Sequence, residues 1–154
     1  MDRPGILTEL ERLGVPFVLH RHEPTHSEEE RRSLPFDPER RVKTLAFEFA
    51  SGLALVALRE QDRLDYAKLA AALGVARASL RPAPHARIGV EPGGLAPIPR
   101  DGADCLFDER AARLGGPVFV GGGEPSATLE VDVDALLALP GTRIADLARL
   151  RAEP

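Results

Sequence analysis

The stretch from Arg40 to Leu58 constrains the fold more than any other part of this sequence. Residues 42–49 are rich in apolar and aromatic side chains, and residues 53–58 form a continuous apolar run. The polar turn Ala50-Ser51-Gly52 separates the two segments. Because apolar runs on either side of a Gly-containing turn are typical of paired strands, the stretch predicts a buried antiparallel hairpin.

Lys43 does not fit this apolar pattern. Alternation along the first strand puts it on the same face as Leu45, Phe47 and Phe49. Only two of the 20 Lys and Arg residues are lysines, Lys43 and Lys68. A lysine ammonium is a compact charge that contacts a single phosphate or ester oxygen in a pocket, whereas Arg presents a planar fork. Two interpretations stay open: Lys43 binds a ligand, or it lies at the strand end and extends to water.

Length and charge limit the classes of protein to which this chain can belong. Its 154 residues suit one domain, residues 1–154, with a substantial core. No signal peptide and no apolar run of roughly 18 residues are present, so we expect a cytoplasmic protein without membrane contact. The net charge of −4 argues against nucleic-acid binding by bulk electrostatics. Contacts to phosphates should therefore be few, through Lys43, Arg40 and Arg41, and supplemented by a partner.

Patterns along the chain predict helices and strands in mixed order. A helix should begin at Asp2 and Pro4 and end at Gly14, and another should begin at Asp65 and end at Gly74. The other expected elements are a strand at 15–20, a helix from Thr25 or Ser27, a short strand around Ser79-Leu80, strands at 103–107, 117–120 and 127–131, helices at 108–114 and 132–139, and a turn and terminal helix within 142–150. This order favours an α+β domain with a mixed, curved, barrel-like β-sheet flanked by helices.

The segment 88–99 has three Gly and three Pro and no helical period. Positive φ angles at Gly93 and Gly94 would let successive backbone amides point at one acceptor, as in an oxyanion hole. The alternative is a proline-rich surface loop. The turn Gly121-Gly122-Gly123 has the same two interpretations, close approach to a ligand or a flexible hairpin.

Other reactive residue types have simpler explanations. His20, His22 and His26 are close in sequence, but Pro24 interrupts the helix that zinc ligands four apart would need, so we expect no metal. One of these histidines could still line a cleft. Cys105 lies in an apolar strand and is expected to be a buried structural thiol, and Lys68 a solvated charge. No nucleophile paired with a base is evident.

These segments together resemble the YbaK and prolyl-tRNA synthetase editing-domain family. The resemblance rests on the order of Val42-Lys43-Thr44-Leu45, Arg63-Leu64-Asp65 before a helix ending Leu73-Gly74, Gly89 ahead of Gly93-Gly94-Leu95-Ala96-Pro97, and the segment from Val118 to Val131. It covers nearly the whole chain. No single piece is specific, but the combination is.

The resemblance implies hydrolysis of the ester that links a wrong amino acid to tRNA, chiefly alanine or cysteine on proline tRNA. It implies a required role for Lys43, at a phosphate or the terminal adenosine, and backbone contacts from Gly93, Gly94, Leu95, Ala96 and Pro97 to the aminoacyl carbonyl. Gly121, Gly122 and Gly123 would contact the substrate, and Thr44, pointing the other way from Lys43, would be structural. No cofactor and no metal are implied.

The sequence departs from the family pattern at two places. Gly123 is followed by Glu124-Pro125-Ser126 instead of a basic residue and a later Gly, and Leu95 and Ala96 stand where small polar residues are frequent. These changes bear on which amino acid is accepted and how the acceptor end of tRNA is held.

We therefore expect a freestanding aminoacyl-tRNA deacylase that acts in trans, with the acceptor end of aminoacyl-tRNA as its partner. Two alternatives stay open. The first is a non-catalytic module that holds an aminoacyl or nucleotide group. The second is a domain active only when docked on prolyl-tRNA synthetase.

Overall fold

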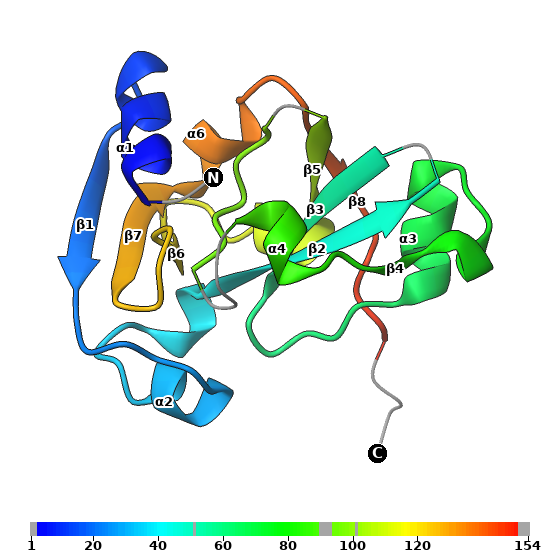
Figure 1. The fold of residues 1–154 in the computed structure, drawn as a ribbon. Coiled ribbons are helices and arrows are strands. Elements are labelled where there is room, and N and C mark those ends of the chain that lie inside the picture. Colours follow the sequence, from blue (N-terminus) through cyan, green and yellow to red (C-terminus); the bar gives the residue numbers. More distant parts are fainter. Residues whose placement is uncertain (1–2, 51, 90–93, 101, 151–154) are drawn as a thin grey trace.

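A computed structural model of the chain describes residues 3–50, 52–89, 94–100 and 102–150. Its helices are α1 (Arg3–Arg12), α2 (Glu28–Arg32), α3 (Tyr66–Leu73), α4 (His85–Ile88), α5 (Glu109–Ala112) and α6 (Val133–Leu137), with 3-10 turns η1 (Pro38–Arg40) and η2 (Arg77–Ser79). The strands are β1 (Phe17–Arg21), β2 (Val42–Phe49), β3 (Gly52–Arg59), β4 (Arg81–Pro82), β5 (Ala103–Asp108), β6 (Pro117–Gly121), β7 (Ala127–Asp132) and β8 (Thr142–Ala145). Figure 1 shows that strands and helices alternate irregularly along the chain.

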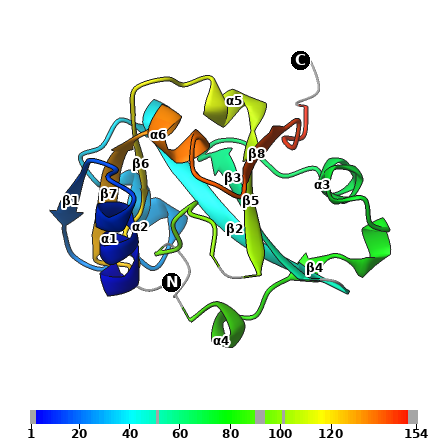
Figure 2. The same ribbon diagram turned by 90° about the horizontal axis from the view of Figure 1, so that it is seen from above.

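The strands form two sheets. In Figure 1, and from above in Figure 2, β1, β6 and β7 lie on one side of the molecule and β3, β4, β5 and β8 on the other. One has the order β1-β7-β6 and is antiparallel. The other has the order β4-β2-β3-β5-β8 and is mixed, because β3, β5 and β8 run parallel while β2 is antiparallel to β3 and β4. An isolated parallel bridge between Arg41 and Phe119 joins the sheets. The α+β class is thus confirmed, whereas the single barrel-like sheet is not found among the described strands.

The β2–β3 hairpin lies at the centre of the five-stranded sheet, as predicted. Val42 pairs with Arg59 and Phe49 with Gly52, so all eight residues of β2 are in register with β3. β3 is buried on both faces, which explains its unbroken apolar sequence. Leu55 and Ala57 belong to a core between the two sheets, and Val56 and Leu58 belong to a second core beneath α3.

Alternation along β2 agrees with this division. Val42 packs in the first core, whereas Leu45, Phe47 and Phe49 pack in or against the second. Lys43 is therefore on the α3 side of β2, and Thr44 faces the core between the sheets.

Both predicted helices are confirmed, although Asp2, the expected start of the first, lies outside the described residues. Ile6 and Leu10 bury the apolar stripe of α1, and Gly14 follows the helix with a φ of 70°. The Asp65 side chain accepts hydrogen bonds from Ala67 N and Lys68 N at the start of α3. Gly74 ends α3 in the left-handed region, with a φ of 69°.

Two local predictions were wrong. The short strand expected at Ser79-Leu80 begins two residues later, because η2 occupies Arg77–Ser79 and β4 pairs with β2 from Arg81. The terminal helix expected within 142–150 is absent from the described residues, where β8 pairs parallel with β5 instead. Tertiary pairing outweighs the weak helical pattern of this short segment.

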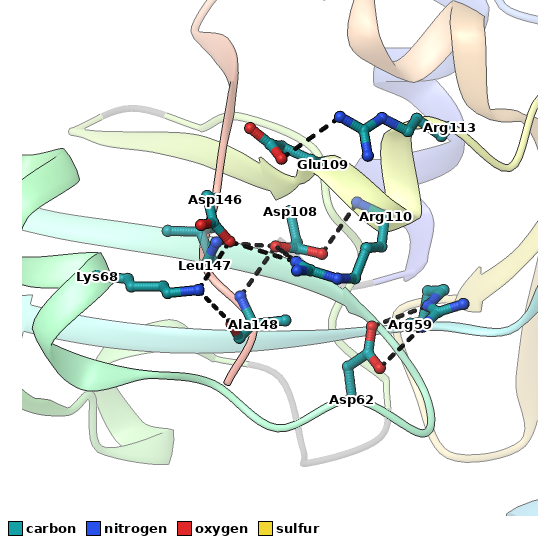
Figure 3. A network of polar contacts seen from close by, with 10 residues as sticks. All are labelled: Arg59, Asp62, Lys68, Asp108, Glu109, Arg110, Arg113, Asp146, Leu147 and Ala148. Atoms are coloured by element: carbon teal, nitrogen blue, oxygen red, sulfur yellow. Dashed lines mark hydrogen bonds and ion pairs between the residues drawn. The ribbon is translucent and has the colours of Figure 1, made fainter. Parts of the chain in front are cut away.

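Residues 146–148 are held by a polar network around Asp108 (Figure 3). The fully buried Asp108 carboxylate accepts hydrogen bonds from Leu147 N at 2.8 Å and Ala148 N at 2.9 Å. Lys68 Nζ donates to Asp146 Oδ1 at 3.0 Å and to the Ala148 carbonyl at 2.9 Å. Lys68 therefore ties α3 to this segment, which differs from the solvated charge that we expected.

Candidate functional site

A cavity of about 280 Å³ lies where β2 and β6 separate. Beyond the Arg41–Phe119 bridge, β2 pairs with β4 only at Phe47 and Glu48, so residues 42–45 have no strand partner on that edge among the described strands. We call this space the central cavity. Its walls are formed by His22, Thr25, Arg31, Leu34, Arg41, Val42, Lys43, Thr44, Leu45, Glu60, Leu95, Phe119, Val120, Gly121, Pro125, Ala127 and Thr128.

The loop after residue 93 packs tightly on the β6–β7 hairpin. Gly123 N donates a 2.7 Å hydrogen bond to the Gly94 carbonyl. A Cβ built on Gly94 would stand 2.7 Å from Glu124 N, and one built on Gly121 would overlap the Leu95 carbonyl oxygen. Glycine is required at both positions because backbone meets backbone there without room for a side chain.

Three separate predicted site segments therefore meet at the central cavity. Lys43 from β2, Leu95 from the loop and Gly121 from the end of β6 all line it. Gly94 is buried behind them against the hairpin.

The other predicted site residues lie elsewhere. Ala96 and Pro97 are buried beside the loop, Gly122 and Gly123 are buried within the hairpin, and none of these four lines the cavity. Gly93 lies outside the described residues.

The predicted backbone conformation of the loop needs correction at Gly94, whose φ is not positive. The described glycines with a positive φ in the loop and the hairpin are Gly89, at 76°, and Gly123, at 93°. Gly94 is needed for its close approach to Glu124, not for a left-handed conformation. Leu95 borders the cavity, and its N–H has no hydrogen-bond partner among the described residues.

One side chain of β2 brings an unpaired charge to this site. Lys43 is half-buried, and within the described part of the chain its ammonium has no hydrogen bond or ion pair. The Thr44 hydroxyl has no partner among the described residues, but it is buried, with almost no surface open to the cavity. Because alternation along β2 turns Thr44 toward the core between the sheets, its expected structural role stays a prediction.

The cavity wall carries two further cations and one acid. Arg41 is 7% exposed, and burial lowers the pKa of its guanidinium by disfavouring the charged form. Its guanidinium carbon lies 6.0 Å from the centre of the Phe36 ring. Arg31 Nε is 3.9 Å from Glu60 Oε1. The cavity therefore has an excess of positive charge.

His22 is the histidine that lines the cavity, which sequence reasoning had left open among three. Its Nδ1 is 2.8 Å from the Glu23 carbonyl and its Nε2 is 2.9 Å from Thr128 Oγ1. Because a carbonyl only accepts, Nδ1 carries the proton, and in the neutral ring Nε2 accepts from the Thr128 hydroxyl. These two contacts fix the His22 ring in the cavity wall. His20 has a different partner, because its Nε2 lies 2.9 Å from Glu130 Oε1.

Arg40 and Cys105 both have structural roles. The Arg40 guanidinium donates to the carbonyls of Leu114, Gly115 and Pro117, so it is not available for the phosphate contact that we expected. Cys105 is fully buried, and burial raises the pKa of its thiol far above the ordinary value. It is therefore a structural thiol, as predicted.

An α+β fold with a small cationic cavity defines a domain suited to binding the polar end of a larger ligand. A model of the aminoacyl-tRNA editing domain family matches residues 22–151. The chain belongs to this family, which confirms the resemblance seen in the sequence.

Solved structures of the same fold agree with this assignment. A hypothetical protein has a TM-score of 0.80 at 23% identity, with 94% of this chain and 99% of that chain covered. A candidate trans-editing enzyme for prolyl-tRNA synthetase has a TM-score of 0.78 at 25% identity, with coverage of 96% and 97%. A candidate signal transduction protein from Marinobacter aquaeolei VT8 has a TM-score of 0.63 at 20% identity, and there the match spans 30% of the longer chain. No curated protein matches the chain in sequence.

Two features are absent from the described residues. No described helix is long and apolar enough to cross a membrane. The described residues also contain no cluster of three potential metal ligands.

Proposed function

We propose that this protein hydrolyses the ester bond of mischarged aminoacyl-tRNA in trans, with alanine or cysteine on proline tRNA as substrate. The observation that carries the proposal is the meeting of Lys43, Leu95 and Gly121 around one cavity. Family membership and the likeness to a candidate trans-editing enzyme for prolyl-tRNA synthetase support it.

The size of the cavity suits a small aminoacyl group. At about 280 Å³ it is just below the roughly 300–1,000 Å³ of typical small-molecule sites. Leu45, Leu95 and Phe119 give it an apolar part, and Lys43 and Arg41 give it a polar part. A small side chain therefore fits, and the bulk of the tRNA stays outside.

The chemistry needs positioning more than a protein nucleophile. The Lys43 ammonium contacts a phosphate or the terminal adenosine, and the Leu95 N–H donates to the ester carbonyl oxygen as negative charge develops. One such donor is typically worth about 3 kcal/mol in the transition state. A bound water, or water assisted by the vicinal ribose hydroxyl, attacks the carbonyl carbon. The C–O bond to the ribose then breaks, the ribose oxygen takes the proton, and free amino acid leaves.

A panel of charged tRNAs tests this function. Purified protein is incubated with Ala-, Cys-, Ser- and Pro-charged proline tRNA, with and without prolyl-tRNA synthetase, and released amino acid is measured. We expect release of alanine or cysteine by the isolated protein, and retention of proline. Binding of the charged tRNA without release would identify a non-catalytic module, and release only with the synthetase would identify a docked domain.

A further inference from the structure

A second hollow adjoins the central cavity, on the other side of Lys43. We call it the outer groove. It has a volume of about 620 Å³ and is lined by Arg32, Lys43, Leu45, Glu60, Gln61, Asp62, Arg63, Leu64, Tyr66 and Arg149. Lys43, Leu45 and Glu60 line both spaces, so the groove lies directly beside the central cavity.

The outer groove is positively charged although the whole chain has a net charge of −4. Four cations line it, and its two acids already have arginine partners outside the groove. Asp62 accepts hydrogen bonds from Arg59 at 2.8 and 3.1 Å, and Glu60 lies 3.9 Å from Arg31. The side chains of Arg63 and Arg149 are exposed and have no partner within the described residues. Three cations without a partner among the described residues, Lys43, Arg63 and Arg149, thus gather at one place on an acidic protein.

Backbone contacts fix the positions of these two arginines. Arg149 N donates a 2.7 Å hydrogen bond to the Arg63 carbonyl, which places the two residues side by side. The segment just before Arg149 is fastened by Asp108 and Lys68, as Figure 3 shows. Because the contacts that hold this part of the groove do not use the two guanidinium groups, both remain available for a ligand.

We propose that the outer groove binds the sugar-phosphate backbone of the single-stranded RNA end whose last residue carries the aminoacyl group. This inference rests on the proposed function, and it assigns phosphate contacts to Arg63 and Arg149. The aminoacyl group occupies the central cavity, and the preceding nucleotides leave past Lys43 into the groove. Guanidinium groups match phosphate oxygens through paired hydrogen bonds, and a strand leaving a small cavity is a single strand, not a duplex.

A double variant, Arg63→Gln with Arg149→Gln, tests the proposal. The control, Arg12→Gln with Arg113→Gln, removes the same charge from exposed arginines that line neither the cavity nor the groove. The probe is a short single-stranded RNA ending in CCA with a 5′ fluorophore, titrated by anisotropy across a salt series. Glutamine keeps the backbone bond between residues 63 and 149, so thermal unfolding of both variants should match that of the unaltered protein.

We expect the groove variant to raise the Kd for the RNA about tenfold or more, and the control less than about twofold. The dependence of log K on log salt should become shallower by about 0.7 for each lost phosphate contact. Equal losses in both variants, or none in either, would overturn the proposal. So would loss of binding to prolyl-tRNA synthetase with unchanged RNA affinity, because the groove would then be a protein-binding surface.

The deacylation rate of the unaltered protein, measured beside these titrations, reports separately on the proposed function. If the protein hydrolyses the ester but its RNA binding does not depend on Arg63 and Arg149, only the groove assignment is refuted. Groove-dependent RNA binding without ester hydrolysis would refute the deacylase function and leave the groove assignment standing.

Discussion

Gly94 and Glu124 lie in backbone contact, so close that a methyl group on Gly94 would stand 2.7 Å from the Glu124 nitrogen. The loop and the hairpin, nearly thirty residues apart in sequence, therefore form one wall of the site. The neighbouring Gly94–Gly123 hydrogen bond fixes their register. A rigid wall of this kind would hold the Leu95 N–H in the fixed position that the proposed contact to the ester carbonyl requires.

Gly94→Ala should reduce both stability and turnover. The added Cβ forces the loop and hairpin apart, and overpacking of this kind costs about 1–3 kcal/mol. Gly52→Ala is the matched control, because a Cβ at Gly52 meets its nearest neighbour, on Phe49, at an ordinary 3.7 Å. Urea unfolding and deacylation per folded molecule measure the two effects. Unchanged stability of Gly94→Ala would show that the packing is looser than described.

The two lysines should respond in opposite ways to replacement by alanine. Lys43→Ala is expected to lower deacylation by about 100-fold or more with little change in stability, since Lys43 has no partner within the described residues. Lys43→Arg should also lose deacylation activity, because the planar guanidinium does not replace a compact ammonium. Lys68→Ala should keep its activity and lower the Tm by about 2–4 °C, as α3 loses its contacts to Asp146 and Ala148. Near-normal turnover by Lys43→Ala would contradict the site.

Thr44→Val and Thr142→Val form a second matched pair. Both hydroxyls are buried without a partner among the described residues, and valine has nearly the same shape, so each change should be neutral or stabilise by about 1 kcal/mol. Thr44 belongs to the wall of the central cavity and Thr142 does not, but neither hydroxyl has surface open to a ligand. Turnover should therefore stay unchanged in both variants. Loss of turnover in Thr44→Val alone, in kinetics on the preferred substrate, would show that this hydroxyl does meet the substrate.

The contacts of Asp146 should make stability depend on pH in the acid range. Hydrogen bonds and charge from Lys68, and then from Arg110, lower the pKa of Asp146 below its ordinary value of 3.8. A lowered pKa in the folded state means that the stabilisation is complete above the ordinary pKa and is lost as the pH falls through the folded one. Asp146→Asn should flatten the fall in Tm between pH 7 and pH 3. Identical pH curves would show that the Lys68–Asp146 contact contributes nothing measurable.

Local sequence determined much of this fold. The β2–β3 hairpin follows from its apolar runs and turn, and α3 from Asp65 and Gly74, because these signals act over a few residues and agree with one another. The place of Lys43 on β2 follows from alternation alone. Its two neighbours in the site, Leu95 and Gly121, were named from the sequence through their glycine-rich surroundings and the family resemblance.

Only the tertiary structure decided how these segments combine. Sequence alone does not show that Gly94 packs on Glu124, that the Arg40 guanidinium is occupied by carbonyls of the α5–β6 connection, or that Arg63 lies beside Arg149. It also misassigned residues 142–150, where pairing of β8 with β5 and the Asp108 carboxylate replace a helix. These outcomes depend on contacts between residues far apart in the chain, and their energies exceed the small local preferences that a sequence pattern records.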